Sequence, residues 1–312
     1  MAKITVIGSF VADHTARVDR LPRTGETVLG RSFHIYPGGK GVNQCVAAAR
    51  LGGDTEMIGM LGGDENGQMF RALLAKEEIS AERVFSSDKP TASALVLIDA
   101  GGQNCICVIP SANYEFGFKE LEQIDGIIKT TELIVLQLEM RLDVTEEIIR
   151  RAHGYGVGIL LNPAPAVKLD DDLLKLVDYL TPNEIELSVL TGLPTKTNEQ
   201  VITAAKALSM RTAGTVIATL GEKGALIARS GAVEHIPGYR VNAVDTVAAG
   251  DSFNGALAVA LTEGKDVEEA VRFANAMGAL TVQKAGAIPS LHTKAQLEDF
   301  IRNNKTADDH FP

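Results

Sequence analysis

One segment near the carboxyl end combines small residues and carboxylates in a pattern suited to chemistry on an anion. Residues 245–256 read DTVAAGDSFNGA and lead into a helical pattern. The tiny side chains at 248–250 let backbone N–H groups approach a ligand closely, and a helix N-terminus adds partial positive charge. Asp251, in the first turn, is either a plain helix cap or a general base that deprotonates a hydroxyl attacking a phosphoryl group. A second carboxylate, Asp245, before the same turn favours the base.

Paired glycines occupy a second candidate turn. Residues 36–44 read YPGGKGVNQ, and glycines permit backbone angles and close approaches that a β-carbon forbids. The spacing is not that of a phosphate-binding P-loop. Lys40 and Asn43 are therefore either ligand contacts at the start of a helix or ordinary surface polar residues.

Carboxylates follow two of the expected strands. Asp13 comes after the apolar run at residues 4–7, and Glu139 comes after the run at residues 133–137. A carboxylate can accept hydrogen bonds from two vicinal hydroxyls, as at a sugar site. Each of the two can equally be a turn residue.

Two further segments are compatible with nucleotide or metal binding. Residues 219–224 read TLGEKG and link two expected strands, so they form either a nucleotide-binding turn or a hairpin. Asn183 and Glu186 stand three apart at the start of a helix, share a face and can hold a hydrated Mg²⁺. The alternative is a capping arrangement, because Asn183 is a good N-cap and Glu186 stands at the third helical position.

Short β-rich runs alternate with longer helical patterns along the chain. Strands are expected at residues 4–7, 56–60, 133–137, 158–161, 178–180, 215–219 and 224–228, and helices at residues 41–51, 65–77, 143–155, 184–191, 198–211, 250–262 and 267–284. This alternation predicts an α/β fold in which helices cover both faces of a mostly parallel sheet. Ligands of such sheets bind at the carboxyl ends of the strands, which is where the candidate residues stand.

Two stretches interrupt the alternation. Residues 11–36 and 91–109 contain strand and turn signals without a helix, and Gly101-Gly102 separates two strand-like runs as in a hairpin. Separated insertions of this kind predict a small β-sheet lid. The remaining segments, residues 1–10, 37–90 and 110–312, are assigned to the α/β domain.

Composition and charge exclude several classes of protein. The 312 residues are 45% hydrophobic and 22% charged, which is ordinary for a globular chain and excludes a disordered one. Forty acidic against 30 basic residues give a net charge of −10, so neither nucleic acid nor an anionic membrane is an expected partner. No stretch resembles a signal peptide or a membrane span. Cys45, Cys105 and Cys107 lack a metal-binding spacing and indicate reduced thiols in the cytoplasm.

Taken together, the motifs resemble those of the ribokinase, or phosphofructokinase-B, family of carbohydrate kinases, from residue 8 to residue 290. Residues 245–257 match the family's C-terminal signature at every position. Residues 38–43 match its N-terminal signature, although Cys45 replaces the usual small Ala, Ser or Thr. Further matches are NPAPA at residues 162–166, PNE at 182–184 and TLGxxG at 219–224.

The resemblance implies an ATP-dependent phosphotransferase. Its fold would be a doubly wound α/β domain that binds nucleotide and sugar, with a β lid. Its reaction would transfer the γ-phosphoryl group to the primary (5-) hydroxyl of a ribose-like pentose, D-ribose or 2-deoxy-D-ribose. Asp251 would be the general base, and the amides of Ala248, Ala249 and Gly250 would steady the phosphoryl group. Sugar-contact positions match Asp13, Gly39, Lys40, Gly41, Asn43 and Glu139, and nucleotide positions match Asn183, Thr219, Gly221, Gly224, Gly250 and Asn275.

The resemblance also implies two ions and a second subunit. Glu186 matches the acidic residue of a motif linked to Mg²⁺. Ribokinases hold a monovalent cation, usually K⁺, beside the anion hole, and the matching positions are Asp245, Val247, Thr281, Lys284, Gly286 and Ser290. Their lids form the dimer contact and close about a glycine hinge, which implies a homodimer here with Gly38-Gly39 as the hinge.

One position departs from the ribokinase pattern. Ribokinases usually have Asn two residues before the lid aspartate, whereas Val11 stands there in this chain, as an apolar residue does in deoxyribose-phosphorylating relatives. Two other functions stay open. The first is a nucleoside kinase on the same fold, with Phe10 and Val11 as an apolar platform for the base. The second is a non-catalytic sugar-binding regulator, against which Asp251 and the intact Ala-Ala-Gly turn argue.

Overall fold

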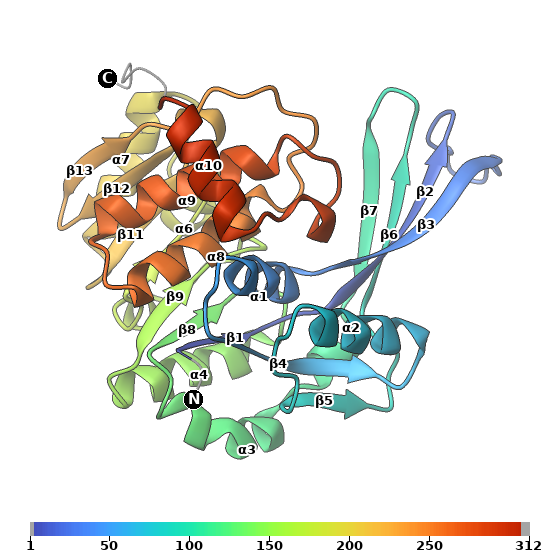
Figure 1. The fold of residues 1–312 in the computed structure, drawn as a ribbon, viewed down its shortest axis with the longest axis horizontal. Coiled ribbons are helices and arrows are strands. Elements are labelled where there is room, and N and C mark those ends of the chain that lie inside the picture. Colours follow the sequence, from blue (N-terminus) through green and yellow to red (C-terminus); the bar gives the residue numbers. More distant parts are fainter. Residues whose placement is uncertain (1–2, 307–312) are drawn as a thin grey trace.

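A nine-stranded sheet forms the centre of the molecule in the computed structural model, which describes residues 3–306 (Figure 1). The strands in spatial order are β13 (Ala232–Ile236), β12 (Ala225–Arg229), β11 (Thr215–Thr219), β10 (Tyr179–Leu180), β9 (Gly158–Leu161), β8 (Leu133–Leu136), β1 (Ile4–Ile7), β4 (Thr55–Gly62) and β5 (Val84–Ser87). All neighbours pair in parallel except β11 with β12 and β12 with β13, which are antiparallel. The predicted mostly parallel sheet is confirmed.

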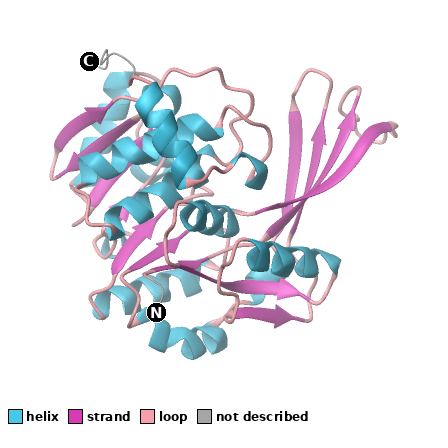
Figure 2. Ribbon diagram, in the orientation of Figure 1, coloured by secondary structure: helices cyan, strands magenta, loops and turns pink. Residues whose placement is uncertain are grey.

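Helices cover both faces of this sheet, each over its own apolar core (Figure 2). The first face carries α1 (Lys40–Arg50), α2 (Glu65–Lys76), α8 (Ala249–Thr262), α9 (Val267–Thr281) and α10 (Lys294–Asn303). The second carries α3 (Phe118–Ile128), α4 (Leu142–Gly154), α5 (Asp171–Leu174), α6 (Glu184–Thr191) and α7 (Asn198–Ser209). Strands buried on both faces read as continuous apolar runs, which explains why the central strands could be recognised.

A second sheet projects from the body as the predicted lid (Figure 1). Its order is β3 (Gly30–Gly38), β2 (Val11–Val18), β6 (Ser93–Ile98) and β7 (Asn104–Ile109), and only β2 and β6 are parallel. Asp64, the N-cap of α2, anchors its base, because its carboxylate accepts hydrogen bonds from the Thr91 amide at 2.8 Å and the Thr91 hydroxyl at 2.6 Å. Strand β3 continues past residue 36, the predicted end of the first lid segment, to Gly38.

The sequence did not predict β5, α3, α5, β13 or α10. Only one of the five positions of strand β13 is buried, and the strand pairs only with β12, so its sequence AVEHI lacks the apolar run of a central strand. Helix α10 buries only Leu297 and Phe300, so its apolar signal is weak. No helix of residues 3–306 is long and apolar enough to span a membrane.

Candidate active site

Asp251 lies in the first turn of α8 with 8% of its surface exposed, and two amide side chains of α1 hold its carboxylate. Asn43 Nδ2 donates to Oδ2 at 2.9 Å, and Gln44 Nε2 donates to Oδ1 at 3.1 Å. Because a carboxylate only accepts hydrogen bonds, it fixes the orientation of both amides. Asn43 Oδ1 is buried and has no partner among the described residues. This oxygen is available to accept a hydrogen bond from a ligand hydroxyl.

The N-terminus of α8 is shaped to receive an anion. Ala248 precedes the helix with a left-handed backbone (φ +62°), a conformation that is unfavourable for a residue with a β-carbon. Within residues 3–306 the amides of Ala248 and Gly250 donate no hydrogen bond, whereas the Ala249 amide donates to the Thr246 carbonyl at 3.3 Å. Unpaired amides at a helix N-terminus attract phosphate groups, and here they lie beside the Asp251 carboxylate.

Glu139 connects the glycine turn to the end of β8. Its Oε2 accepts hydrogen bonds from the Lys40 amide at 2.9 Å and from the Ser9 hydroxyl. A β-carbon at Gly39, where φ is +99°, would lie 2.7 Å from a backbone nitrogen of β2. One at Gly41 would overlap the Ser9 amide, so this glycine lets α1 pack directly against the end of β1. Gly39 and Gly41 therefore allow the turn before α1 to pack closely against β1 and β2.

The Lys40 side chain lies among three carboxylates. Burial lowers its pKa, but the charges of Asp251, Glu139 and Glu186 outweigh burial and hold the pKa above its ordinary value. The ammonium group therefore stays charged at physiological pH. A half-buried positive charge at the Asp251 end of the site adds to the attraction of that end for an anion.

Asp13 brings a lid carboxylate to the glycine turn. A β-carbon at Gly38 would overlap the Asp13 carboxylate, so the two residues are in direct contact. Burial, followed by the negative charge of Glu139, raises the pKa of Asp13 to about 6. No hydrogen bond from the described part of the chain reaches this carboxylate, and its oxygens are available to accept from ligand hydroxyls.

The two apolar residues before Asp13 lie in different surroundings. Val11 shares a face of β2 with Asp13 and packs against Ala92 and Ala94 of the lid base. Phe10 is fully buried, with its ring edge-on to Phe70 at a centroid distance of 5.1 Å. Phe10 is thus part of the core. It cannot contribute to the apolar platform for a nucleoside base that the nucleoside-kinase alternative required.

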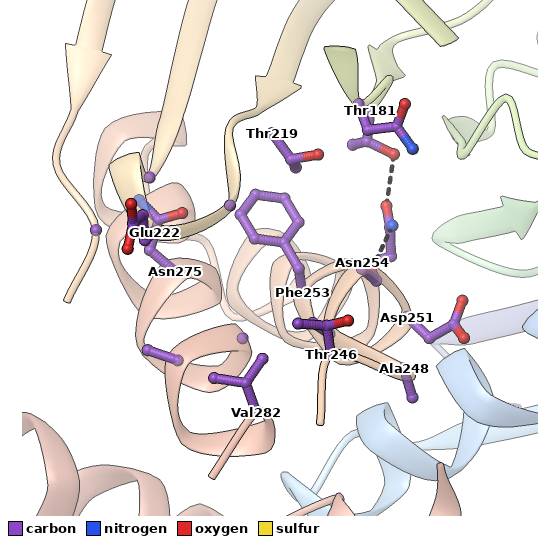
Figure 3. Close-up of a pocket in the computed structure, with 18 of the residues that line it drawn as sticks. Thr181, Thr219, Glu222, Thr246, Ala248, Asp251, Phe253, Asn254, Asn275 and Val282 are labelled. Carbon is purple, nitrogen blue, oxygen red and sulfur yellow. Dashed lines mark hydrogen bonds between the residues drawn. The ribbon is translucent and has the colours of Figure 1, made fainter. Parts of the chain in front are cut away.

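A cavity of about 610 Å³ extends from Lys40 and Asp251 past the start of α8. All the predicted nucleotide residues line it: Asn183, Thr219, Gly221, Gly224, Gly250 and Asn275. Figure 3 shows Asp251 at the end of the cavity opposite to Glu222 and Asn275. The predicted sugar residues Asp13, Gly39, Gly41, Asn43 and Glu139 do not line this cavity but gather beyond its Lys40–Asp251 end.

The turn between β11 and β12 closes the far end of the cavity. Gly224 has φ +95°, and a β-carbon there would overlap the Ile236 carbonyl. Asn275 of α9 donates from Nδ2 to that same carbonyl at 3.1 Å. Asn275 therefore stabilises the backbone at this end of the cavity. Its side-chain oxygen Oδ1 remains available to a ligand.

Asn183 and Glu186 form the capping arrangement that the sequence kept as the alternative. Asn183 Oδ1 accepts from the Glu186 amide at 2.9 Å, and the Glu186 carboxylate accepts from the Asn183 amide and side chain, both at 2.8 Å. Burial raises the pKa of Glu186, and its side chain still lines the cavity. A carboxylate oxygen offers more than one lone pair, so capping leaves capacity to bind a metal-bound water.

Asp245 joins the two loops expected around a monovalent cation. Its Oδ1 accepts from the Val247 amide at 3.0 Å, and its Oδ2 accepts from the Gly286 amide at 2.9 Å. The structure thus brings residues 245–247 and the 281–290 segment together, with Thr281 and Ser290 both fully buried. The remaining predicted ligand, Lys284, lies in the same segment, where its amide donates to the Thr281 carbonyl at 3.2 Å.

Sequence reasoning missed three buried amides next to the base: Gln44, Gln137 and Asn162. Gln44 donates to Asp251 and to Asn162 Oδ1, and Gln137 donates to Gln44. The one signal in the sequence was Gln44 itself, a polar residue followed by the apolar residues 45–49 of the same helix. A polar side chain on such a buried helix needs a partner.

Sequence comparison identifies the class of protein that carries this site. A profile described as pfkB family carbohydrate kinase matches residues 1–294. The chain belongs to this family. The kinase is 37% identical to the ribokinase of Haemophilus influenzae over 96% of its own length and 98% of that protein. It is 34% identical to the deoxyribokinase of Salmonella typhi over 97% of its length and 99% of that protein.

Solved structures lead to the same family. The kinase superposes on Arabidopsis thaliana ribokinase complexed with ribose and ATP with a TM-score of 0.87 and 33% identity, over 96% of this chain and 99% of that one. The fold predicted from the motifs, a ribokinase-like α/β domain with a small separate sheet, is therefore confirmed. The activity class, a phosphotransferase acting on a sugar, is confirmed with it.

Proposed function

We propose that the kinase transfers the γ-phosphoryl group of ATP to the primary hydroxyl of a ribose-like pentose, with Asp251 as the general base. The observation that carries this proposal is the buried Asp251 carboxylate, oriented by two amides and adjacent to the unpaired amides at the start of α8. A ribokinase and a deoxyribokinase among its relatives favour D-ribose or 2-deoxy-D-ribose as the acceptor.

In the proposed reaction the sugar lies between Asp13 of the lid, Asn43 of α1 and Asp251. Asp251 takes the proton of the primary hydroxyl as its oxygen forms a bond to the γ-phosphorus. The bond between that phosphorus and the bridging oxygen breaks, and its electrons leave with ADP. The amides of Ala248 and Gly250 would stabilise the negative charge on the transferring group, where preorganised donors are most effective.

Two ions fit the side chains present. The Glu186 carboxylate supplies oxygens of the kind that hydrated Mg²⁺ prefers, and the ion would neutralise phosphate charge. Asn183 positions that carboxylate, because its Oδ1 already accepts from the Ile185 and Glu186 amides. The Asp245 carboxylate with the carbonyls of Val247, Thr281, Lys284 and Gly286, and with Ser290, forms an all-oxygen donor set suited to K⁺. The hydrogen bond from the Gly286 amide to Asp245 supports this set, because it connects the 281–290 segment to the loop that leads into the anion-binding turn.

We further propose a cytoplasmic homodimer that forms through the lid and has neither nucleic acid nor membrane partners. All three cysteines are free thiols, which is typical of a reducing compartment. On the lid face opposite Asp13, Phe33, Ile35 and Leu95 are 57%, 41% and 54% exposed. Exposed apolar side chains gathered on one face are typical of a protein interface, and a second lid would cover them.

The function is tested by following ADP release with ribose, 2-deoxyribose, fructose, tagatose and nucleosides as acceptors. The proposal expects the two pentoses to be phosphorylated with the highest kcat/KM. A higher kcat/KM for a hexose or a nucleoside would overturn the assignment of the acceptor. Product analysis should locate the phosphate on the primary hydroxyl.

A further inference from the structure

A chain of buried amides extends from Asp251 through α1 to the ends of β8 and β9. Gln44, on α1, is fully buried, and its two Nε2 hydrogens bond to Asp251 Oδ1 and Asn162 Oδ1, each at 3.1 Å. Its Oε1 accepts from Gln137 Nε2 at 2.7 Å. Gln137 follows β8 and is 2% exposed. Three elements that are far apart in sequence thus meet behind one carboxylate.

The negative charge of Asp251 sets the direction of every bond in this chain. Since a carboxylate cannot donate, the amide nitrogen of Gln44 must face it, and Gln44 Oε1 must face the other way. Gln137 can meet that oxygen only with its own amide nitrogen. The consequence is visible in Gln137 Oε1, which is buried without a partner among residues 3–306. Leaving a buried acceptor unpaired costs free energy. The hydrogen bonds that orient Asp251 therefore form even though Gln137 Oε1 is left unpaired among the described residues.

We propose that Gln44 is a positioning residue for the catalytic base and that Gln137 acts on the base through Gln44. This inference rests on the proposed role of Asp251. Asn43 alone would hold only one carboxylate oxygen, and the group would be free to rotate away from the sugar hydroxyl. Gln44 holds the second oxygen. Because Gln44 is fully buried, its loss should change the rate of proton removal and not the binding of either substrate.

The test compares Gln44→Met, Gln137→Met and the double variant with Asp251→Asn in the full-length enzyme, using the best acceptor sugar. Methionine keeps the length of glutamine and removes both polar atoms. Gln44→Met should lower kcat by about 10- to 100-fold, the range for losing a hydrogen bond to a charged group, with both KM values within about threefold of wild type. Gln68→Met, at an exposed position of α2, is the matched control and should leave kcat unchanged.

The double variant separates positioning from general loosening of the core. Gln137→Met should lower kcat by roughly 3- to 10-fold, the effect of a neutral hydrogen bond, and the double variant should match Gln44→Met alone. If the fold-losses in kcat of the two single variants multiply in the double variant, Gln137 does not act through Gln44 and the proposal is overturned. An unchanged kcat in a folded Gln44→Met enzyme would overturn it as well. If Gln44→Met does not fold, an unchanged kcat in Gln137→Met overturns the proposal in its place. An inactive Asp251→Asn beside a fully active Gln44→Met defeats this inference alone, whereas an active Asp251→Asn defeats the proposed function itself.

Discussion

The ionisation of Asp13 should make sugar binding depend on pH near neutrality. Burial and the charge of Glu139 raise the pKa of this carboxyl from 3.8 to about 6. Only the ionised carboxylate can accept hydrogen bonds from two sugar hydroxyls with both oxygens. With a pKa near 6, about nine tenths of the molecules are ionised at pH 7 and about one tenth at pH 5. The Kd for the sugar should therefore rise roughly tenfold from pH 7 to pH 5.

Calorimetric titration of the sugar without ATP measures this dependence, because no proton is transferred to Asp251 in the binary complex. The expected curve has its midpoint near pH 6. The Asp13→Asn variant should bind the sugar weakly and with little pH dependence. A wild-type Kd that stays constant down to pH 5 would refute the reasoning, since an ordinary aspartate remains ionised there.

The same perturbation predicts a change in stability with a definite sign. Because the pKa of Asp13 is raised on folding, the folded protein binds more protons than the unfolded chain between pH 4 and 6, and Asp13 destabilises the fold as pH rises through this range. At pH 7 the penalty is at most about 3 kcal/mol. Asp13→Asn should accordingly raise Tm at pH 7 while it impairs sugar binding, and an unchanged or lower Tm would contradict the assigned burial of the charge.

Three further outcomes are expected. Val11→Asn should shift the kcat/KM ratio toward D-ribose over 2-deoxy-D-ribose by about 1–2 kcal/mol, the scale of one net hydrogen bond; a wild type that prefers ribose a hundredfold, with no shift in the variant, would exclude Val11 from the sugar pocket. Activity should be higher in K⁺ than in tetramethylammonium, and Asp245→Asn should remove the difference; equal wild-type rates in both salts would exclude the cation site. Leu95→Asp should convert a dimer to a monomer in light scattering, with Gln103→Asp as control; an unchanged dimer would place the interface elsewhere.

Local sequence signals were sufficient to find the residues at the ends of the parallel strands. Lys40, Asn183 and Asp251 each belong to short motifs whose residue types and spacing are visible in one segment of the chain, and all three line one cavity. The central strands were recognisable because burial on both faces requires continuous apolar runs. Weakly buried elements such as β5 and α10 lack that signal.

The hydrogen bonds that orient the Asp251 carboxylate could not be predicted from the sequence. Gln44 pairs with Asn162 and Gln137, which are 118 and 93 positions away. No local pattern encodes such contacts, since they exist only after β8, β9 and α1 have been packed together. The sequence also left open whether Asn183 and Glu186 form a helix cap or hold a hydrated Mg²⁺. The answer depended on whether the Glu186 carboxylate reaches back to the helix start, and the hydrogen bonds of the folded chain show that it does.

The role of Asp251 is the central claim, and the kinetics of Asp251→Asn test it most directly. Asparagine keeps the size of the side chain and removes the base, so kcat should fall by roughly 10²–10⁴-fold, the usual contribution of one positioned acid–base group. The Kd values for sugar and ATP, measured by calorimetry on the same variant, should stay close to those of wild type. Retention of more than about a tenth of the wild-type kcat would contradict the account, because a phosphoryl acceptor would then be activated without this carboxylate.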